Sequence, residues 1–197
     1  MSKDRKALIL EAATKSFTQF GYKATTMDLV AKLANVGKGT IYTFFKNKEE
    51  LFDDIFSSLL IEMKQTADQA IDPDLPFHEN AHRAMMAILE YRKKHQLTIK
   101  IFQEGAELGT PAAREVIEKL ERMVVSYIKR KIKEAIKNDD IRPCDPELNA
   151  FVIFKLYIAL IFDWEKNHKP LKDEELAEML KMYILKGLSL SLIHISE

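Results

Sequence analysis

The sequence predicts an all-α fold, with a small head of three helices at the N-terminal end, a larger helical body and about nine helices in total. Glycine and proline number only six each among 197 residues, which suits long helices better than strands joined by tight turns. Apolar residues recur every three or four positions along most of the chain, as they do on one face of a helix. With 47% apolar and 30% charged residues, the composition is that of an ordinary globular protein.

The first helices of the head are marked by their expected ends. The first is expected from about Asp4 to Phe20, with Gly21 as its C-terminal stop. The second follows Thr25 or Thr26, because either hydroxyl can cap a helix by accepting a hydrogen bond from a free backbone N–H.

A tight turn is expected between the second helix and a third. Asn35 tolerates the left-handed conformation that such a turn needs, and Gly37 opens a helix from Lys38 to Phe45. Ile41 and Phe45 fall on one inward side of that helix. The head is predicted to pack around apolar side chains from its three helices, namely Phe17, Phe20, Val30, Val36, Ile41 and Phe45.

The body contains the remaining helices. Asn47 is placed to cap the first of them, with Glu50 in position for a capping box. The expected bounds of the body helices are about 48–70, 77–95, 97–108, 111–137, 146–167 and 173–188. The helix over 146–167 is almost wholly apolar in its middle, so we expect it to be buried both in the body and against a partner subunit. The 188–197 tail does not continue the helical pattern.

The outward side of the third helix combines lysine, glycine, threonine and tyrosine, which suits a groove of nucleic acid. Gly39 has no side chain to keep another backbone away, and Thr43 offers a hydroxyl and a methyl group to base edges. Tyr42 and Lys48 suit phosphate oxygens. The predicted DNA-binding residues are Thr26, Lys38, Gly39, Thr40, Tyr42, Thr43, Phe44, Lys46 and Lys48.

The charge distribution supports this interpretation. The formal net charge is zero, but residues 1–48 hold nine Lys or Arg against three acidic residues, so this part carries +6 and the remainder −6. A basic head on an acidic body is typical of proteins that bind nucleic acid. One groove-reading helix binds weakly, whereas a symmetric dimer presents two of them about one DNA turn apart. The expected partners are therefore a second copy of the chain and a palindromic double-stranded DNA operator.

Residues 26–51 resemble the DNA-binding domain of the TetR family of bacterial transcriptional regulators, whose pattern is roughly T-x-x-x-I-A-x-x-A-G-V-S-x-G-x-x-Y-x-x-F-x-x-K-x-x-L. Asn35 and Gly37 depart from it, since Gly and then Ser or Thr are usual there. The matching residues are Thr26, Val30, Ala31, Ala34, Val36, Gly39, Tyr42, Phe45, Lys48 and Leu51.

The resemblance implies two domains and a mechanism. Residues 1–47 would form a helix-turn-helix DNA-binding domain, and residues 48–197 a helical domain for ligand binding and dimerisation. The homodimer would form through the last two helices. The protein would be a repressor that an unknown small-molecule effector releases from its operator, and no other cofactor is expected.

The body offers many large, adaptable side chains that could line an effector cavity. Met and aromatic residues suit an irregular apolar ligand, although at helical spacing each can also be plain core. The candidate effector-binding residues are Met85, Tyr91, Phe102, Met123, Tyr127, Phe154, Tyr157 and Trp164.

One motif points to a different function. The run His78-Glu79-Asn80-Ala81-His82 matches the H-E-x-x-H pattern of zinc hydrolases. Pro76 places His78 in a first helical turn, so we predict no catalytic residue, no metal ligand and no enzyme. A metal-dependent hydrolase using His78, Glu79 and His82 stays open as an alternative, as does a helical interaction protein that does not bind DNA.

The sequence also predicts a cytoplasmic location. Its single cysteine, Cys144, fits a reducing compartment. No apolar run approaches the ~20 residues that a membrane span requires, and the N-terminal residues lack the pattern of a signal peptide. No membrane partner is therefore expected.

Overall fold

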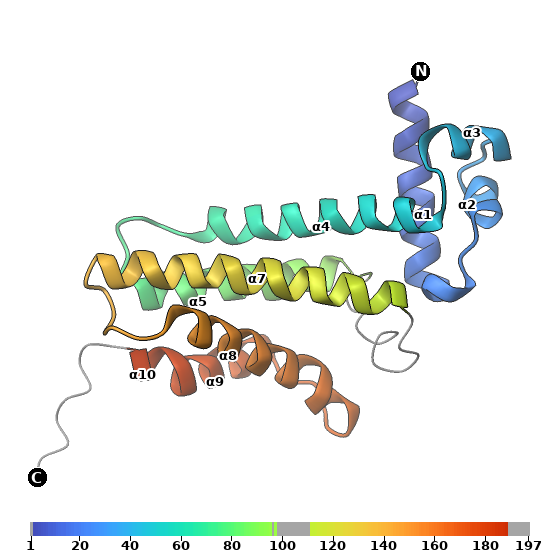
Figure 1. Cartoon of the computed structure of the whole chain (residues 1–197). Coiled ribbons are helices and arrows are strands. Elements are labelled where there is room, and N and C mark those ends of the chain that lie inside the picture. The colour runs from blue at the N-terminus through green and yellow to red at the C-terminus, as the bar shows by residue number, and fades with distance from the viewer. Residues whose placement is uncertain (1, 96, 98–110, 189–197) are drawn as a thin grey trace, which may run out of the picture. The chain divides into compact units, whose positions relative to one another are not determined.

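The computed structural model describes residues 2–95, 97 and 111–188, and every regular element in these ranges is helical (Figure 1). The prediction of an all-α fold is confirmed. The longer elements are α1 (Ser2–Ala24), α2 (Met27–Leu33), α3 (Lys38–Phe44), α4 (Lys48–Ala70), α5 (Phe77–Lys94), α7 (Pro111–Lys137), α8 (Pro146–Ile158) and α9 (Asp173–Leu180). Most of the predicted helix over 97–108, and the tail over 189–197, lie outside the described residues.

Two of the predicted helices continue with altered winding. After α8 the chain forms a π-helical turn over Ala159–Asp163 and a 3₁₀ turn over Trp164–Lys166. After α9 a second π-helical turn covers Lys181–Leu185, before the short α10 (Lys186–Leu188). The predicted spans 146–167 and 173–188 are thus helical almost throughout, but not as single α-helices.

The chain divides into two compact units. The first unit contains Met1–Met63 and Arg92–Glu118, and the second contains Lys64–Tyr91 and Lys119–Glu197. The predicted functional boundary between residues 47 and 48 stays a prediction. In the part of the chain that the structure describes, no helix is both long and apolar enough to cross a membrane.

The core of the head is built around Phe17, Val30, Ile41 and Phe45, all of which are buried as predicted. The prediction that Phe20 packs in this core is wrong, because its side chain is 51% exposed. Tyr22 is buried in the core of the head in its stead. Its ring stacks on Phe17 at 5.9 Å and lies 4.8 Å from the ring of Phe52 in α4.

Gly21 explains why Tyr22 rather than Phe20 turns inward. Helical hydrogen bonding resumes after Gly21 and α1 reaches Ala24, but the backbone at Gly21 has φ 77° and ψ 173°. Only glycine adopts this region readily, because a Cβ would collide with the backbone. Gly21 therefore ends the first helical run, as the sequence predicts, and α1 continues beyond this kink as a second, short helical run to Ala24.

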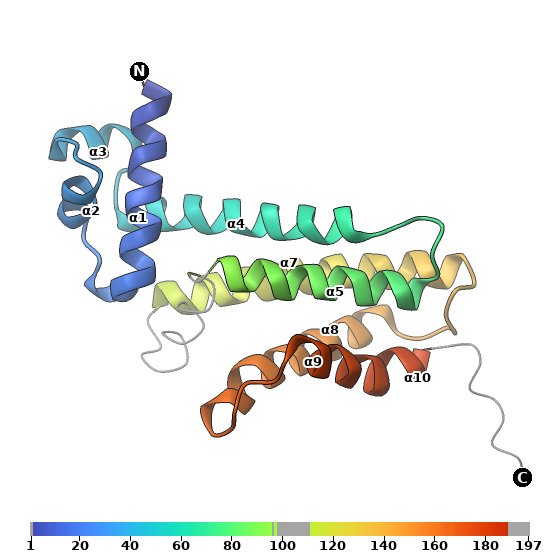
Figure 2. The same cartoon turned by 180° about the vertical axis from the view of Figure 1, so that it is seen from behind.

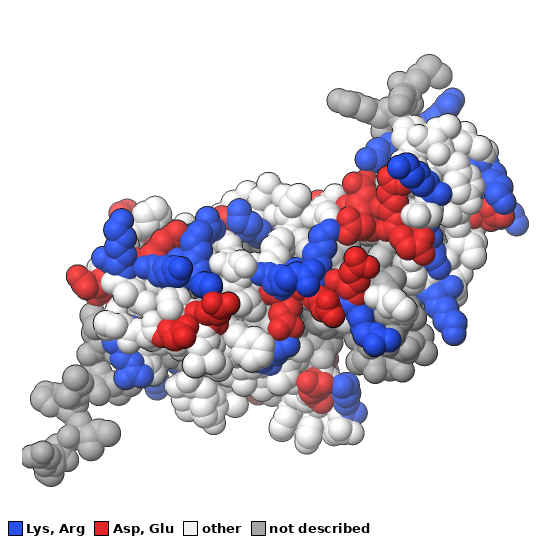
Figure 3. All heavy atoms as spheres, in the orientation of Figure 1, with Lys and Arg blue, Asp and Glu red and all other residues white. Residues whose placement is uncertain are grey.

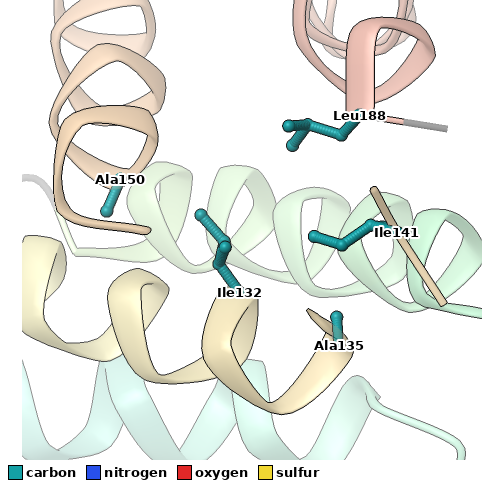
Figure 4. Packing of buried hydrophobic residues seen from close by; sticks show 5 residues of the cluster. All are labelled: Ile132, Ala135, Ile141, Ala150 and Leu188. Carbon is teal, nitrogen blue, oxygen red and sulfur yellow. The ribbon is translucent and has the colours of Figure 1, made fainter. Parts of the chain in front are cut away.

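Two apolar clusters lie among the described residues of the second unit. One joins α7, the loop after it, α8 and α10 through Ile132, Ala135, Ile141, Ala150 and Leu188, whose side chains converge in Figure 4. The other joins α5, the π-helical turn after α8, and α9 through Leu89, Ile161, Leu176 and Leu180. Asp145 sets the start of α8, because its carboxylate accepts from the backbone N–H groups of Glu147 and Leu148 at 2.8 and 3.0 Å.

Gly21→Ala is expected to destabilise the protein by about 1–3 kcal/mol, because alanine cannot adopt this backbone conformation without strain. Chemical denaturation would measure the change. Gly187→Ala is the matched control, since a Cβ there meets no atom within 4 Å and alanine is favoured inside a helix. Equal stability of Gly21→Ala and the wild type would contradict the argument.

Candidate nucleic-acid interface

The candidate interface is built on α2 and α3, which both pack on α1 (Figures 1 and 2). Thr26 is the N-cap of α2, and its hydroxyl accepts from the backbone N–H of Leu29 at 3.1 Å. Thr25, the other candidate cap, is fully buried and donates to the carbonyl oxygen of Gly21 at 2.8 Å. Because this uses the one hydroxyl proton of Thr25, Ser16 is the donor in their 3.0 Å contact.

The turn between α2 and α3 has the predicted geometry. Asn35 has φ 52°, in the left-handed region that asparagine tolerates. Gly37 is the N-cap of α3 and provides no side-chain hydrogen bond. The two helices are held close by this turn, and Ile41 is the residue of α3 that is buried.

The opposite side of α3 faces solvent, as the sequence predicts. Lys38, Gly39, Tyr42 and Thr43 are exposed, whereas Thr40 and Phe44 are partly buried. The hydroxyl of Thr43 donates to the carbonyl oxygen of Thr40 at 2.7 Å, which uses its one proton and leaves the oxygen able to accept a further hydrogen bond.

Gly39 has no structural role inside the described part of the chain. A Cβ added at this position meets no atom within 4 Å, and the backbone there is helical. Alanine would therefore fit and would favour the helix. A glycine at such a position is useful where another molecule must come close to the backbone.

Two of the predicted DNA-binding lysines already have partners. Lys38 forms an ion pair with Asp28 of α2, with its Nζ 2.8 Å from Oδ1. The hydrogen bond from Lys38 to Asp28 raises the pKa of the lysine. Lys48, in the first turn of α4, donates to the carbonyl oxygen of Tyr22 at 2.9 Å and lies 4.2 Å from the centre of the Tyr22 ring.

Tyr22 also holds the second residue of α4. Its hydroxyl donates to Glu49 Oε1 at 2.7 Å, and this hydrogen bond is the main cause of a lowered pKa of Glu49. Sequence reasoning missed Tyr22, Glu49 and Asp28 as neighbours of the interface. The position of Tyr22 directly after a glycine indicates that the backbone could bend there. The direction in which the bend turns Tyr22 depends on the tertiary fold, so the sequence alone does not predict it.

The start of α4 is capped nearly as predicted. Asn47 Oδ1 accepts from the backbone N–H of Glu50 at 2.8 Å, and Glu50 in turn accepts from the backbone N–H of Lys46 at 2.7 Å. The return bond thus reaches the residue before the cap. The ammonium group of Lys46 is exposed, and basic side chains are spread over the head with acidic ones beside them (Figure 3).

The candidate effector-binding residues fall in different environments. Met85 and Tyr157 pack together with the cluster around Leu89. Tyr91 and Phe154 are buried, and Met123 is half-buried. Phe102 lies outside the described residues.

Two other effector candidates are engaged elsewhere. Tyr127 is half-buried and donates to Asp68 Oδ1 at 2.8 Å, and burial followed by this bond raises its pKa. Trp164 is 41% exposed and stacks on His168 with ring centres 3.8 Å apart. The structure thus brings Met85 and Tyr157 together and keeps Trp164 out of the core.

The residues of the H-E-x-x-H motif lie in the first turns of α5. His78 and Glu79 are exposed, with side-chain accessibilities of 57% and 52%, and His82 is partly buried. Within the described ranges, no group of three or more His, Cys, Asp or Glu side chains is arranged to hold a metal ion. The hydrolase alternative therefore gains no support.

Comparison with known proteins gives a consistent result. A family model described as "Bacterial regulatory proteins, tetR family" matches residues 9–55. Over 189 residues the chain is 74% identical to the uncharacterised HTH-type transcriptional regulator YhgD of Bacillus subtilis (strain 168), and the match covers 96% of this chain and 99% of that protein.

Solved structures agree with the fold. A protein assigned as a fatty acid metabolism regulator of Clostridium perfringens is 26% identical, with a TM-score of 0.71 and coverage of 93% of this chain and 99% of that one. A TetR-family protein of Syntrophomonas wolfei is only 19% identical but has a TM-score of 0.80, with coverage of 99% and 100%. The second match shows the fold alone.

Tyr22→Phe is expected to lower the free energy of unfolding near neutral pH by less than about 1 kcal/mol, because it removes a partly exposed hydrogen bond. The lowered pKa of Glu49 means that this stability is present above the unfolded-state pKa of about 4.3 and is lost as the pH falls through the folded-state pKa. Denaturation of both proteins across this range should show the difference shrinking in acid. Glu49→Gln should remove the same pH dependence, and a difference that is constant with pH would refute the assignment.

Proposed function

Because the chain belongs to the TetR family of bacterial regulatory proteins and is a helix-turn-helix transcriptional regulator, we propose that it represses transcription from a palindromic operator. It binds as a homodimer in the cytoplasm, and a small-molecule effector releases it. The observation that carries the DNA-binding part is the outward side of α3, where a glycine that the fold does not require lies among exposed polar side chains.

Residues 1–47 form the DNA-binding domain in this proposal. Thr43 and Lys38 face base edges, because the N-terminal part and outward side of the second helix enter the major groove. Tyr42 and Lys46 are exposed and reach phosphates. The remaining contact residues are Thr26, Gly39, Thr40, Phe44 and Lys48.

Exposed apolar residues on the last helices support a homodimer. On α8, Leu148, Phe151 and Val152 are 59%, 43% and 43% exposed, and after α9 Met182 and Tyr183 are 47% and 60% exposed. Soluble proteins cover such concentrations of apolar surface by association. The helix over 146–167, which is almost wholly apolar in its middle, thus has one side in the core, at Ala150 and Phe154, and another side available to a second copy.

The effector is proposed to act in the body. The cluster around Leu89 gathers Met85 and Tyr157, side chains that suit an apolar ligand. The 26% identical protein assigned as a fatty acid metabolism regulator makes fatty acids and their thioesters sensible first probes. An effector releases DNA only through its difference in affinity for the DNA-bound and free arrangements of the dimer.

Gly39→Ala is expected to weaken DNA binding while leaving the fold as stable as the wild type or slightly more so. The added methyl group meets no protein atom but occupies the space through which the DNA backbone approaches. Gel shifts with DNA from upstream of the protein's own gene would measure affinity at several salt concentrations, and thermal denaturation would measure stability.

The same gel shifts test the function itself. Affinity of the wild type must fall as salt rises, because phosphate contacts release counterions. Binding that is unaffected by salt, or absent on every duplex tried, would contradict a DNA-binding regulator. Equal affinity of Gly39→Ala and the wild type would contradict only the placement of Gly39 at the DNA.

Phe151→Glu is expected to convert the dimer to monomers, because it places a charge in the proposed apolar interface. Sedimentation velocity of the purified protein would show the change of mass. Ile61→Glu is the matched control, since Ile61 is 56% exposed on α4 and outside the last two helices. The interface would be wrong if Phe151→Glu stayed dimeric, or if Ile61→Glu dissociated equally.

A further inference from the structure

Asp28 of α2 and Lys38 of α3 form an exposed ion pair between the two helices of the proposed DNA surface. Asp28 lies in the first turn of α2, and Lys38 is the first residue of α3. The ammonium nitrogen of Lys38 lies 2.8 Å from Oδ1 and 2.9 Å from Oδ2 of Asp28. Both side chains remain open to solvent, with accessibilities of 65% for Lys38 and 62% for Asp28.

This pairing makes Lys38 a poor phosphate contact. A phosphate that approaches the ammonium group also approaches the carboxylate of Asp28, and like charges repel. The proposed interface offers a better phosphate contact in Lys46, whose side chain is exposed. If the Asp28–Lys38 pair lay against the DNA backbone, the carboxylate of Asp28 would therefore weaken binding.

The base edges on the floor of the major groove are better partners for the Asp28–Lys38 pair than phosphates are. The N-terminal residues of a recognition helix are those that reach base edges, and Lys38 is the first of α3. Base edges carry both acceptors and donors, so a lysine donor and a carboxylate acceptor held side by side can each find a partner there. The ion pair also restricts both side chains before binding, which lowers the entropy that binding costs.

We propose that Asp28 and Lys38 together read one G·C base pair in each half-site of the operator. Lys38 donates to O6 and N7 of guanine, and Asp28 accepts from the N4 amino group of the paired cytosine, which are the preferred partners of the two side-chain types. The inference rests on the proposed function, because it requires that α3 lies in the major groove. It adds Asp28, which the helix-turn-helix pattern does not include, as a specificity-determining residue.

Selection from a library of random duplexes tests the inference with the full-length protein. The wild type should select a palindromic motif with a G·C pair at one symmetric position. Lys38→Gln should move that position to A·T, because glutamine prefers adenine. Asp28→Asn should reduce the discrimination between G·C and A·T there by a factor of roughly 5 to 150, the range for one base contact, and other positions should not change.

A matched control separates base reading from charge. Glu11→Gln also removes one negative charge from an exposed position of the head, so it should leave the selected motif unchanged. Circular dichroism should show wild-type helix content for all three variants, because the substituted side chains are exposed.

The outcomes are distinguishable. If the wild type selects no motif, both the proposed function and this inference are contradicted. If the wild type selects a motif and both variants keep it while changing affinity for all sequences alike, only the inference fails, since the pair then acts through charge. The inference is also overturned if the wild type selects A·T at the position whose base preference changes in the Lys38→Gln variant.

Discussion

The geometry of the head depends on the bend at Gly21. A backbone conformation available to glycine turns Tyr22 toward the core, where its ring contacts Phe17 and Phe52. The same residue then binds Lys48 through its ring and its backbone carbonyl oxygen, and Glu49 through its hydroxyl. Tyr22 thereby links the first helix to the fourth within the first unit, and the start of α4 is fixed next to the helices proposed to contact DNA.

Two of the lysines that are predicted to contact DNA, Lys38 and Lys48, are held in different ways. Lys48 is held by an aromatic ring and a backbone carbonyl. Neither carries a net charge that would neutralise the ammonium group, so Lys48 can still attract a phosphate. Lys38 is held by a carboxylate, which changes what it can bind. Sequence reasoning predicts both residues as DNA contacts, Lys48 from the family pattern and Lys38 from the outward side of the third helix. It does not distinguish a phosphate contact from a base contact, because that difference lies in the neighbour that each lysine has in space.

Features set by local chemistry could be predicted from the sequence, and features set by tertiary contacts could not. The turn at Asn35, the cap at Thr26 and the exposed side of α3 follow from conformational preference and helical spacing, and the structure has all three. The exposure of Phe20 and the burial of Tyr22 could not be predicted, because periodicity continues through Gly21 whereas the real backbone bends there. The effector candidates show the same limit, since helical spacing cannot separate Met85, which joins a core cluster, from Trp164, which stacks on a nearby histidine at the surface.

The proposed pairing of two chains through the exposed apolar side chains on α8 and after α9, among them Phe151 and Tyr183, has a consequence for how the amount of regulator controls its effect. Pairing of two identical chains depends on the square of their free concentration, so below the dissociation constant of the pair the number of active molecules falls faster than the number of chains made. A cell that halves synthesis of this chain would then lose more than half of its operator-binding species. The steep dependence of transcription on the amount of regulator would then originate at this apolar surface, which lies far along the sequence from the residues proposed to contact DNA.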